Sequence, residues 1–415
     1  MRYDIIIKDI DTVYTLSQGN IPRIKNELKG LSPLSCVSIA IKNGKIVKVG
    51  KIIDGEANDI LDGKNSIAIP GFVDCHTHTI FGGNRANEWL RRLKGESYLS
   101  ILKSGGGIID TVNQTRGLPI YQMLEETKVK LDRMLKSGTT TVEIKSGYGL
   151  DHNTEIRMLE IANELNKSNK YDVISTYMGA HAIPPEYRND REGYIKLVID
   201  NLDEIKEKRL ATFVDIFCEE GAFTIDESRK ILEKAKILGF NIRLHADELA
   251  RSRGAILAGE LKARSADHLL TIDAEEIDAM FEGNVAAVLL PGTAYQMRSK
   301  NIPPVRSMID KGLAIAVASD FNPGSCPIYS MSVILSFAVS LYGLSPEEAL
   351  TASTINSAYV LGIGAKKGSI EVGKDADILL LDMQSIEEIP YWFNDLHLKY
   401  IIKNGIILNN EGDLI

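Results

Sequence analysis

Residues 70–78 read Pro70-Gly71-Phe72-Val73-Asp74-Cys75-His76-Thr77-His78, an apolar run that ends in two histidines. The apolar part is typical of a buried β-strand, and side chains two positions apart on an extended backbone project to the same side. His76 and His78 can therefore bind one cation. A His-x-His pair alone also occurs by chance on protein surfaces, so the strand that carries the pair is what favours a metal site.

Outward from this strand, short apolar runs alternate with longer helix-like stretches between residues 67 and 367. Such alternation is typical of βα units around a parallel sheet. The expected strands cover residues 68–73, 139–144, 174–178, 213–217, 242–244, 264–267, 285–290 and 314–318. The expected helices include residues 120–137, 155–166, 194–207, 226–238 and 345–358. About eight such repeats predict an α/β fold, a TIM-type (β/α)8 barrel.

The two ends of the chain follow a different pattern. Residues 37–49 and residues 400–408 each contain two apolar runs around an Asn-Gly dipeptide, which is a strong hairpin signal. An isolated hairpin is barely stable, so the hairpins from the two ends are expected to pair with each other. We predict a small composite β-sandwich domain from residues 1–66 and 368–415, beside a barrel domain from residues 67–367.

The composition is that of an ordinary globular protein, with 44% hydrophobic and 25% charged residues. The formal net charge of -8 gives no electrostatic reason to expect nucleic acid or a membrane surface as a partner. We expect no signal peptide and no membrane span. The four cysteines have no Cys-x-x-Cys spacing, which argues against disulfides and against a thiolate zinc site. The sequence predicts a cytoplasmic protein with reduced thiols.

Histidines mark the strand ends, which form the active-site face of a barrel. Of the seven histidines, five lie at or just after an expected strand end: His76, His78, His181, His245 and His268.

Two further strand ends complete a metal-binding set. His245 ends the strand at 242–244, and Asp320 follows the strand at 314–318. Alone, His245 is better explained as a core histidine, and Asp320 equally as a helix N-cap. Together with His76 and His78 they supply three nitrogens and one oxygen, which suits one divalent ion, zinc or iron.

Proton chemistry requires further residues. An ion at such a site lowers the pKa of a bound water towards neutrality. Glu248 is placed to take the proton from that water, and His268 to stabilise the oxyanion that forms on a carbonyl. Asp320 would hold and orient the nucleophile. Asp267 is the alternative reactive acid, with His268 then merely structural.

Several runs resemble the imidazolonepropionase family of the amidohydrolase superfamily. The resemblance covers most of the expected barrel, in the same order. It rests on residues 73–78, 81–88, 143–150, 179–187, 244–248, 290–293 and 319–324. The Gly-Gly-Asn-Arg-Ala-Asn-Glu run at 82–88 and the Lys-Ser-Gly-Tyr-Gly run at 145–149 are its most specific parts.

The resemblance implies hydrolysis of 4-imidazolone-5-propanoate to N-formimidoyl-L-glutamate, a step of histidine degradation, at a mononuclear site. It implies these substrate-binding residues: Arg85, Tyr148, His181, Glu248, Asn322, Gly324 and Ser325. The Arg85 guanidinium suits a propionate carboxylate, although an ion pair with Glu88 is the plainer explanation of that arginine. Lys145 invites comparison with the carbamylated lysine of two-metal relatives, but the resemblance favours one ion.

Two other functions stay open at the level of sequence. A deaminase-type amidohydrolase would share the metal set without needing a carboxylate clamp at Arg85. A non-catalytic barrel scaffold would bind no stoichiometric metal. For any of the enzymes the partner is a small-molecule substrate, and a homodimer is the commonest assembly.

Overall fold

The computed structural model describes residues 2–96, 100 and 105–408. Its central sheet has eight strands, each parallel to its neighbours, in the order in which they occur along the chain. The strands are β6 (Phe72–Asp74), β7 (Thr139–Lys145), β8 (Asp172–Ala180), β9 (Phe213–Cys218), β10 (Asn241–Ala246), β11 (Ser265–His268), β12 (Ala286–Leu289) and β13 (Ile315–Val317).

The parallel sheet closes between its first and last strands. Beyond β6 and β13, Thr77 pairs with Phe321 in a parallel bridge. The Asp320 N–H donates to the His76 carbonyl at 3.0 Å, and the His78 N–H donates to the Phe321 carbonyl at 2.9 Å. The predicted barrel is therefore confirmed, and its closure joins the segments that carry His76, His78 and Asp320.

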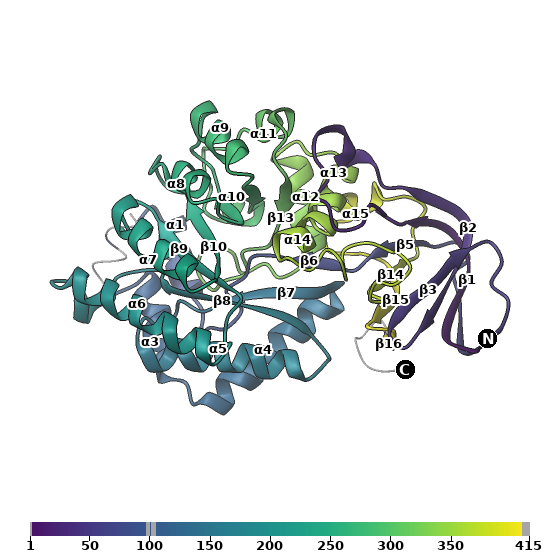
Figure 1. The fold of residues 1–415 in the computed structure, drawn as a ribbon, viewed down its shortest axis with the longest axis horizontal. Helices are drawn as coiled ribbons and strands as arrows, with labels where there is room; N and C mark the ends of the chain where they lie inside the picture. The colour runs from purple at the N-terminus through teal and green to yellow at the C-terminus, as the bar shows by residue number, and fades with distance from the viewer. Residues whose placement is uncertain (1, 97–99, 101–104, 409–415) are drawn as a thin grey trace.

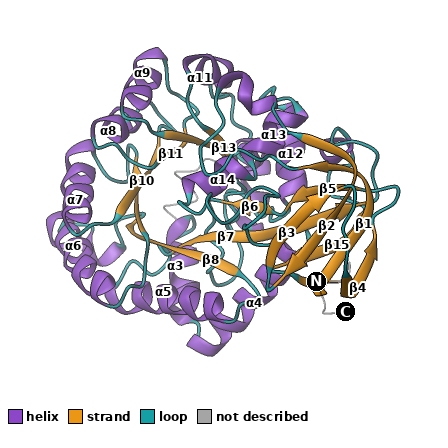
Figure 2. Ribbon diagram, turned by 45° about the vertical axis from the view of Figure 1, so that its right-hand side comes forward, coloured by secondary structure: helices purple, strands orange, loops and turns teal. Residues whose placement is uncertain are grey.

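Helices surround the barrel (Figures 1 and 2). Their amphipathic faces pack on the strands, and several begin at side-chain caps, such as Asp151, which accepts the Thr154 N–H. The helices are α1 (Ala86–Leu93), α3 (Ile108–Gly117), α4 (Ile120–Lys136), α5 (His152–Lys167), α6 (Arg191–Glu207), α7 (Ile225–Ile237), α8 (Gly254–Glu260), α9 (Ala274–Glu282), α10 (Pro291–Gln296), α11 (Val305–Lys311), α12 (Met331–Ser340), α13 (Pro346–Ala352), α14 (Ile355–Val360) and α15 (Glu388–Tyr391), with the 3-10 turns η1 (Lys25–Lys29) and η2 (Pro185–Tyr187).

The single helix predicted over residues 345–358 is wrong, because the chain forms α13 and α14 there. Between them the hydroxyls of Ser353 and Thr354 donate to the Leu350 carbonyl at 3.2 and 2.5 Å. Hydroxyl groups that compete in this way for backbone carbonyls weaken the regular helical ladder.

Strands from both chain ends form a second sheet, as predicted. Figure 1 shows the purple N-terminal strands beside the yellow C-terminal ones, away from the helical ring. The order is β16-β15-β14-β5-β1-β2-β3, with β4 also paired to β1. The bounds are β1 (Arg2–Tyr14), β2 (Pro33–Lys42), β3 (Lys45–Gly50), β4 (Glu56–Asp62), β5 (Ile67–Pro70), β14 (Ile378–Leu381), β15 (Leu398–Lys403) and β16 (Ile406–Leu408).

The two Asn-Gly turns contact each other. Asn43 and Gly44 have φ of +51° and +72°, and Asn404 and Gly405 have φ of +50° and +74°. Glycine tolerates this region of backbone space without strain. A Cβ on Gly405 would lie 2.7 Å from the Gly44 Cα, so glycine also allows the turns to meet.

Gly71 divides the strand predicted over residues 68–73. The part before it, β5, pairs with β1 and β14 in the terminal sheet, while the part after it, β6, begins the barrel. A Cβ on Gly71 would lie 2.3 Å from the Thr140 Oγ1, so only glycine fits at this passage. The domain boundaries at residues 66/67 and 367/368 stay a proposal. Residues 1 and 409–415 of the predicted terminal domain lie outside the described part of the chain.

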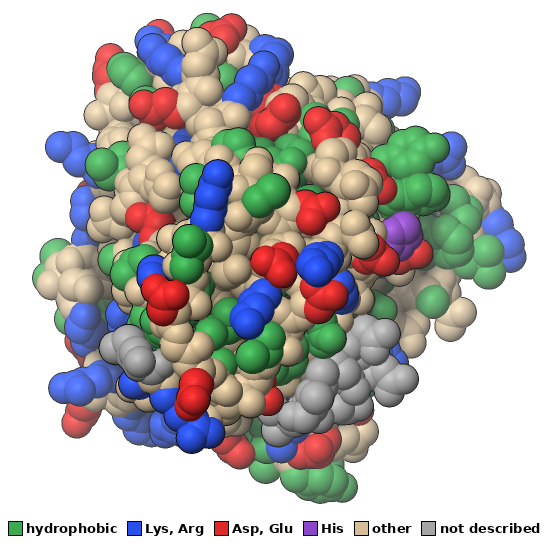
Figure 3. Space-filling model, turned by 90° about the vertical axis from the view of Figure 1, so that its right-hand side faces the viewer, with side chains coloured by type: hydrophobic (Ala, Val, Ile, Leu, Met, Phe, Trp, Pro, Cys, Tyr) green, Lys and Arg blue, Asp and Glu red, His purple; other side chains and the backbone are tan. Residues whose placement is uncertain are grey.

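Lysine and arginine side chains are interspersed with aspartate and glutamate over the face that carries the terminal sheet (Figure 3). Within the described residues, no helix has the length and apolar character needed to cross a membrane.

Candidate metal centre

Five buried histidines meet at the carboxyl ends of the barrel strands. His76 and His78 follow β6, His181 follows β8, His245 is in β10, and His268 ends β11. The ring centroids of His76 and His245 are 4.4 Å apart, those of His78 and His181 4.9 Å, and those of His245 and His268 5.2 Å. The strand-end positions expected from the sequence therefore bring these side chains into one cluster.

The four predicted metal ligands present their donor atoms to each other. The Nε2 atoms of His78 and His245 are 3.3 Å apart, and Asp320 Oδ1 lies 3.6 Å from the Nε2 atoms of both His76 and His78. The His76 Nε2 is buried and has no hydrogen-bond partner among the described residues. A buried acceptor without a donor is costly, and a cation among these atoms would satisfy all of them.

A second grouping of donor atoms overlaps the first. His76, His78 and Asp320 form one group whose donor atoms lie within 4.8 Å of one another, and His76, His245 and His268 form another. The geometry thus allows His268 to act as a metal ligand, whereas the sequence analysis predicts that it contacts the substrate.

Burial keeps the imidazoles of His76, His78 and His181 neutral. Burial lowers the pKa of His76 and His78 well below the usual range, and nearby Lys145 and neighbouring histidines lower both further. Burial also lowers the pKa of His181 to about 3. A neutral imidazole has the lone pair that a metal ion requires. Burial raises the pKa of Asp320 to about 6, against the opposing hydrogen bond from Thr293.

Two carboxylates contact the rings of predicted metal ligands through their Nδ1 atoms. Asp267 Oδ2 contacts the His76 Nδ1 at 2.6 Å, and Asp215 Oδ1 contacts the His245 Nδ1 at 3.2 Å. A carboxylate on one ring nitrogen leaves the other nitrogen for a metal, the usual arrangement behind metal-bound histidines. Asp267 contacts the His76 ring, which favours a structural role for Asp267 over the alternative role of reactive acid. Asp215 has no place among the sequence predictions.

Lys145 is buried between two carboxylates. Its Nζ donates to Glu143 Oε1 at 2.7 Å and to Asp215 Oδ2 at 2.6 Å. Burial and Arg243 lower the pKa of Lys145, but Asp215 and Glu143 outweigh them and raise it overall. An ammonium fixed in this way lacks the free amine that forms a carbamate, which supports a single ion.

Glu248 lies at the rim of the cluster, with Oε2 3.6 Å from the His268 Nε2. Burial raises the pKa of its carboxyl group well above the usual range, and Asp320 and Glu219 raise it further. His268 and Asp320 have φ of +76° and +52°, a left-handed conformation that costs energy in residues other than glycine. Strain of this kind is typical of functional sites.

Glu219 holds the segment that carries Glu248. Its carboxylate accepts the N–H groups of Glu248, Leu249 and Ala250 at 2.8, 3.0 and 3.2 Å, and the Ser252 hydroxyl. Sequence reasoning missed this residue. The available signal was an acid two positions after the strand predicted over 213–217, at the strand ends that carry the predicted histidines.

Two of the predicted substrate residues, Tyr148 and His181, lie against His78. His181 stacks on His78, and the buried Tyr148 ring lies 5.3 Å from His181. The His181 Nδ1 lies 3.0 Å from the Gly147 carbonyl, so Nδ1 carries the hydrogen and Nε2 is an acceptor.

Arg85 does form the predicted ion pair with Glu88. Its Nε donates to Glu88 Oε2 at 2.8 Å, and Nη2 contacts Oε1. A Cβ on Gly324 would lie 2.0 Å from the Arg85 Nη1, so the guanidinium lies against the Gly324 backbone. The structure therefore places Arg85 and Gly324 side by side.

Asn322 shapes the loop after Asp320. Its Oδ1 accepts the N–H groups of Gly324 and Ser325 at 2.9 and 2.7 Å, and its Nδ2 donates to the Asp320 carbonyl at 2.7 Å. These contacts fix Gly324 beside Arg85. The substrate contacts expected of Asn322, Gly324 and Ser325 stay predictions.

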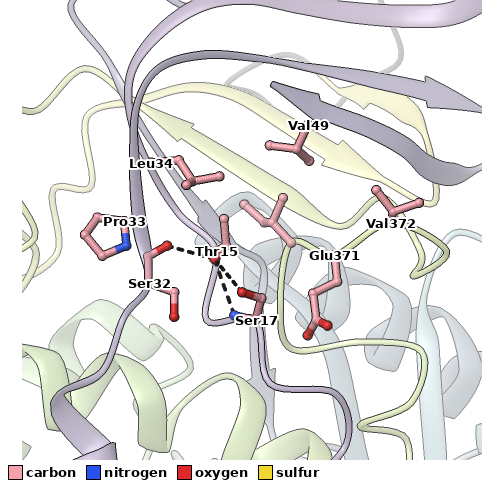
Figure 4. Close-up of a pocket in the computed structure, with 9 residues that line it drawn as sticks. Thr15, Ser17, Ser32, Pro33, Leu34, Val49, Glu371 and Val372 are labelled. Carbon is pink, nitrogen blue, oxygen red and sulfur yellow. Dashed lines mark hydrogen bonds between the residues drawn. The ribbon is translucent and has the colours of Figure 1, made fainter. Parts of the chain in front are cut away.

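A cavity of about 480 Å³ lies elsewhere, on the terminal sheet (Figure 4). Its Thr15 hydroxyl donates to the Ser32 carbonyl at 2.8 Å, and its Glu371 carboxylate accepts the Gln18 and Gly19 N–H groups. These polar groups are already satisfied, so the histidine cluster is the better candidate site.

Comparison with known proteins agrees with this geometry. Residues 67–408 match the amidohydrolase family. An imidazolonepropionase from Thermoanaerobacter pseudethanolicus is 43% identical over 97% of this chain and 97% of its own. One from Bacillus cytotoxicus is 40% identical over 99% of this chain and 98% of its own.

Solved structures resemble the fold. A zinc-bound adenosine deaminase from Xanthomonas campestris has a TM-score of 0.74 at 18% identity, covering 100% of this chain and 94% of its own. A triazine hydrolase variant has a TM-score of 0.72 at 15% identity, covering 100% and 96%. At such identities the likeness concerns the fold alone.

Proposed function

This chain belongs to the imidazolonepropionase family of the amidohydrolases, and from that premise and its histidine cluster we infer that it opens the ring of 4-imidazolone-5-propanoate. The enzyme is a hydrolase of cyclic amide C–N bonds. Water adds across the ring amide, so that the carbonyl carbon becomes a carboxylate and the ring nitrogen gains a hydrogen. The product is N-formimidoyl-L-glutamate, an intermediate of histidine degradation.

One divalent ion, zinc or iron, would be held by His76, His78, His245 and Asp320. The observation that carries this proposal is a set of three contacts that link the four side chains: His245 to His78 at 3.3 Å, and Asp320 to both His76 and His78 at 3.6 Å. When bound, such an ion lowers the pKa of water and polarises a carbonyl.

Glu248 and His268 perform the proton and charge chemistry in this proposal. Glu248 takes a proton from the attacking water and gives it to the departing ring nitrogen. His268, beside it, stabilises the negative charge on the former carbonyl oxygen. Asp320 orients the nucleophile, and Asp267 keeps the His76 ring in place. Tyr148 and His181 form the wall against which the flat ring packs.

An assay of ring opening tests the function directly. Metal-stripped protein should be inactive on imidazolone propionate, and addition of zinc or ferrous iron should restore turnover. A purified protein with neither stoichiometric metal nor metal-restored activity would contradict the proposal. The proposal also includes a cytoplasmic location, a homodimeric assembly and a small-molecule substrate.

Replacing Arg85 with methionine should raise KM for imidazolone propionate, because the substrate carboxylate loses its cationic partner. Charge-assisted hydrogen bonds are worth about 1.5–3 kcal/mol, so KM should rise roughly 10- to 150-fold. Steady-state kinetics measures the change, with Arg133→Met on the exposed face of α4 as the matched control. An unchanged KM would favour an uncharged ring as substrate, as in the deaminase alternative.

Replacing Glu219 with glutamine should lower kcat with little change in KM. The amide NH2 cannot accept the N–H groups that the carboxylate holds, so the segment carrying Glu248 shifts. A misplacement of about 1 Å can cost 10²-fold in rate. Glu220→Gln, the same change at the exposed neighbour, should have little effect. Wild-type kcat in Glu219→Gln would remove this positioning role.

A further inference from the structure

Arg243 lies directly beneath the cluster and is fully buried in β10. Its Nη1 donates to the Cys75 carbonyl at 2.8 Å and contacts Glu143 Oε1 at 3.2 Å. Its Nη2 donates to Asp267 Oδ2 at 2.7 Å, and its Nε donates to the Ser265 hydroxyl at 2.9 Å. One side chain thus links four other residues of the barrel interior, none of them a proposed metal ligand.

These contacts converge on His76. The Cys75 carbonyl belongs to the peptide just before it. Glu143 Oε2 accepts the Thr77 N–H, just after it, at 3.1 Å. Asp267 Oδ2, which Arg243 holds, contacts the His76 ring itself at 2.6 Å. The backbone on both sides of His76 and the orientation of its ring therefore depend on the same guanidinium.

We propose that Arg243 is a positioning residue for metal binding, which sets the affinity of the site by fixing His76 through Cys75, Glu143 and Asp267. The proposal rests on the metal site of the proposed function. Lys145 also donates to Glu143, at 2.7 Å, and Ser265 donates to Asp267 Oδ1, at 2.6 Å. Arg243 donates to Asp267 Oδ2, the atom that contacts His76, so the link through this atom is the one to test.

Lysine cannot replace this arginine. The planar guanidinium spans acceptors in several directions, whereas an ammonium is a compact charge on a flexible stem. Arg243→Lys therefore keeps the positive charge beside Asp267 but loses the simultaneous contacts to the His76 segment. Asp267→Asn keeps the shape of the next link and loses its charge.

Zinc affinity of the metal-stripped protein tests the proposal, measured by competition with a chromophoric chelator. Loss of a partner behind a metal ligand typically costs 10- to 100-fold in affinity, so Arg243→Lys and Asp267→Asn should each weaken zinc binding by about that factor. Because both changes interrupt the same link, the double variant should bind about as weakly as the weaker single variant.

Arg264→Lys is the matched control. Arg264 precedes β11, and its guanidinium contacts the carbonyls of Tyr359 and Val360. The zinc affinity of the Arg264→Lys variant should therefore equal that of the wild type. Wild-type affinity in Arg243→Lys or in Asp267→Asn, or losses that add in the double variant, would overturn the positioning role. A wild-type protein that binds no stoichiometric zinc would instead overturn the metal site itself. If Arg243→Lys fails to fold, the zinc affinity of Asp267→Asn tests the link by itself, and wild-type affinity in that variant overturns the proposal.

Discussion

Replacing Glu248 with glutamine should leave the metal content unchanged and reduce kcat by about 10²- to 10⁴-fold, the usual contribution of a positioned general base. The amide has nearly the same size but cannot accept the proton from water. Glu248 is not among the proposed ligands, and its Oε2 lies 3.6 Å from the His268 Nε2.

Its partly buried position suits that role. Burial raises the pKa of the Glu248 carboxyl group, and a raised pKa brings a carboxylate closer to the value at which it both accepts and returns a proton.

The control is Glu220→Gln, which removes an exposed carboxylate from the neighbouring strand end. Metal analysis and single-turnover kinetics of both variants distinguish loss of chemistry from loss of metal. Near-normal turnover in Glu248→Gln would transfer the proton steps to another group, with Asp320 the next candidate.

The strand-end rule of barrels explains why the sequence could predict the metal set. His76, His78, His245 and Asp320 each end an apolar run, and in a parallel barrel all such ends lie on one face. The rule needs no knowledge of which strands are neighbours. The same rule could have found Glu219, which follows the strand at 213–217, but no pattern of metal ligands draws attention to a single acid.

The residues below the cluster were beyond sequence reasoning. Asp215 and Arg243 lie inside β9 and β10, and strands of a parallel barrel are covered on both faces, so alternation does not reveal which polar side chain points inward. Their partners also lie far along the chain. Arg243 contacts Cys75, 168 positions away, and Glu143, 100 positions away.

The passage at Gly71 was unpredictable for a related reason. The apolar run that contains β5 and β6 looks like one strand, because residues buried in either sheet have the same character. Only the three-dimensional contact with Thr140 shows why the chain must have glycine where it leaves one sheet and enters the other.

Replacing Asp320 with asparagine should abolish stable metal binding and, with it, turnover. Asp320 is the one anionic donor in the proposed set, and its Oδ1 lies 3.6 Å from two of the imidazole nitrogens. Loss of a direct ligand should exceed the effect of a partner behind a ligand, so zinc affinity should fall by more than about 100-fold.

Thermal unfolding gives a readout independent of activity. A ligand at about 100 times its Kd stabilises the folded state by about 2.7 kcal/mol, so zinc should raise the Tm of the metal-stripped wild type. The Tm of Asp320→Asn should not respond to the same zinc concentration. Asp395→Asn is the matched control, because Asp395 is an exposed carboxylate beside His397 and outside the cluster. Stoichiometric zinc and a wild-type Tm shift in Asp320→Asn would remove Asp320 from the ligand set and leave the three histidines with a different fourth donor.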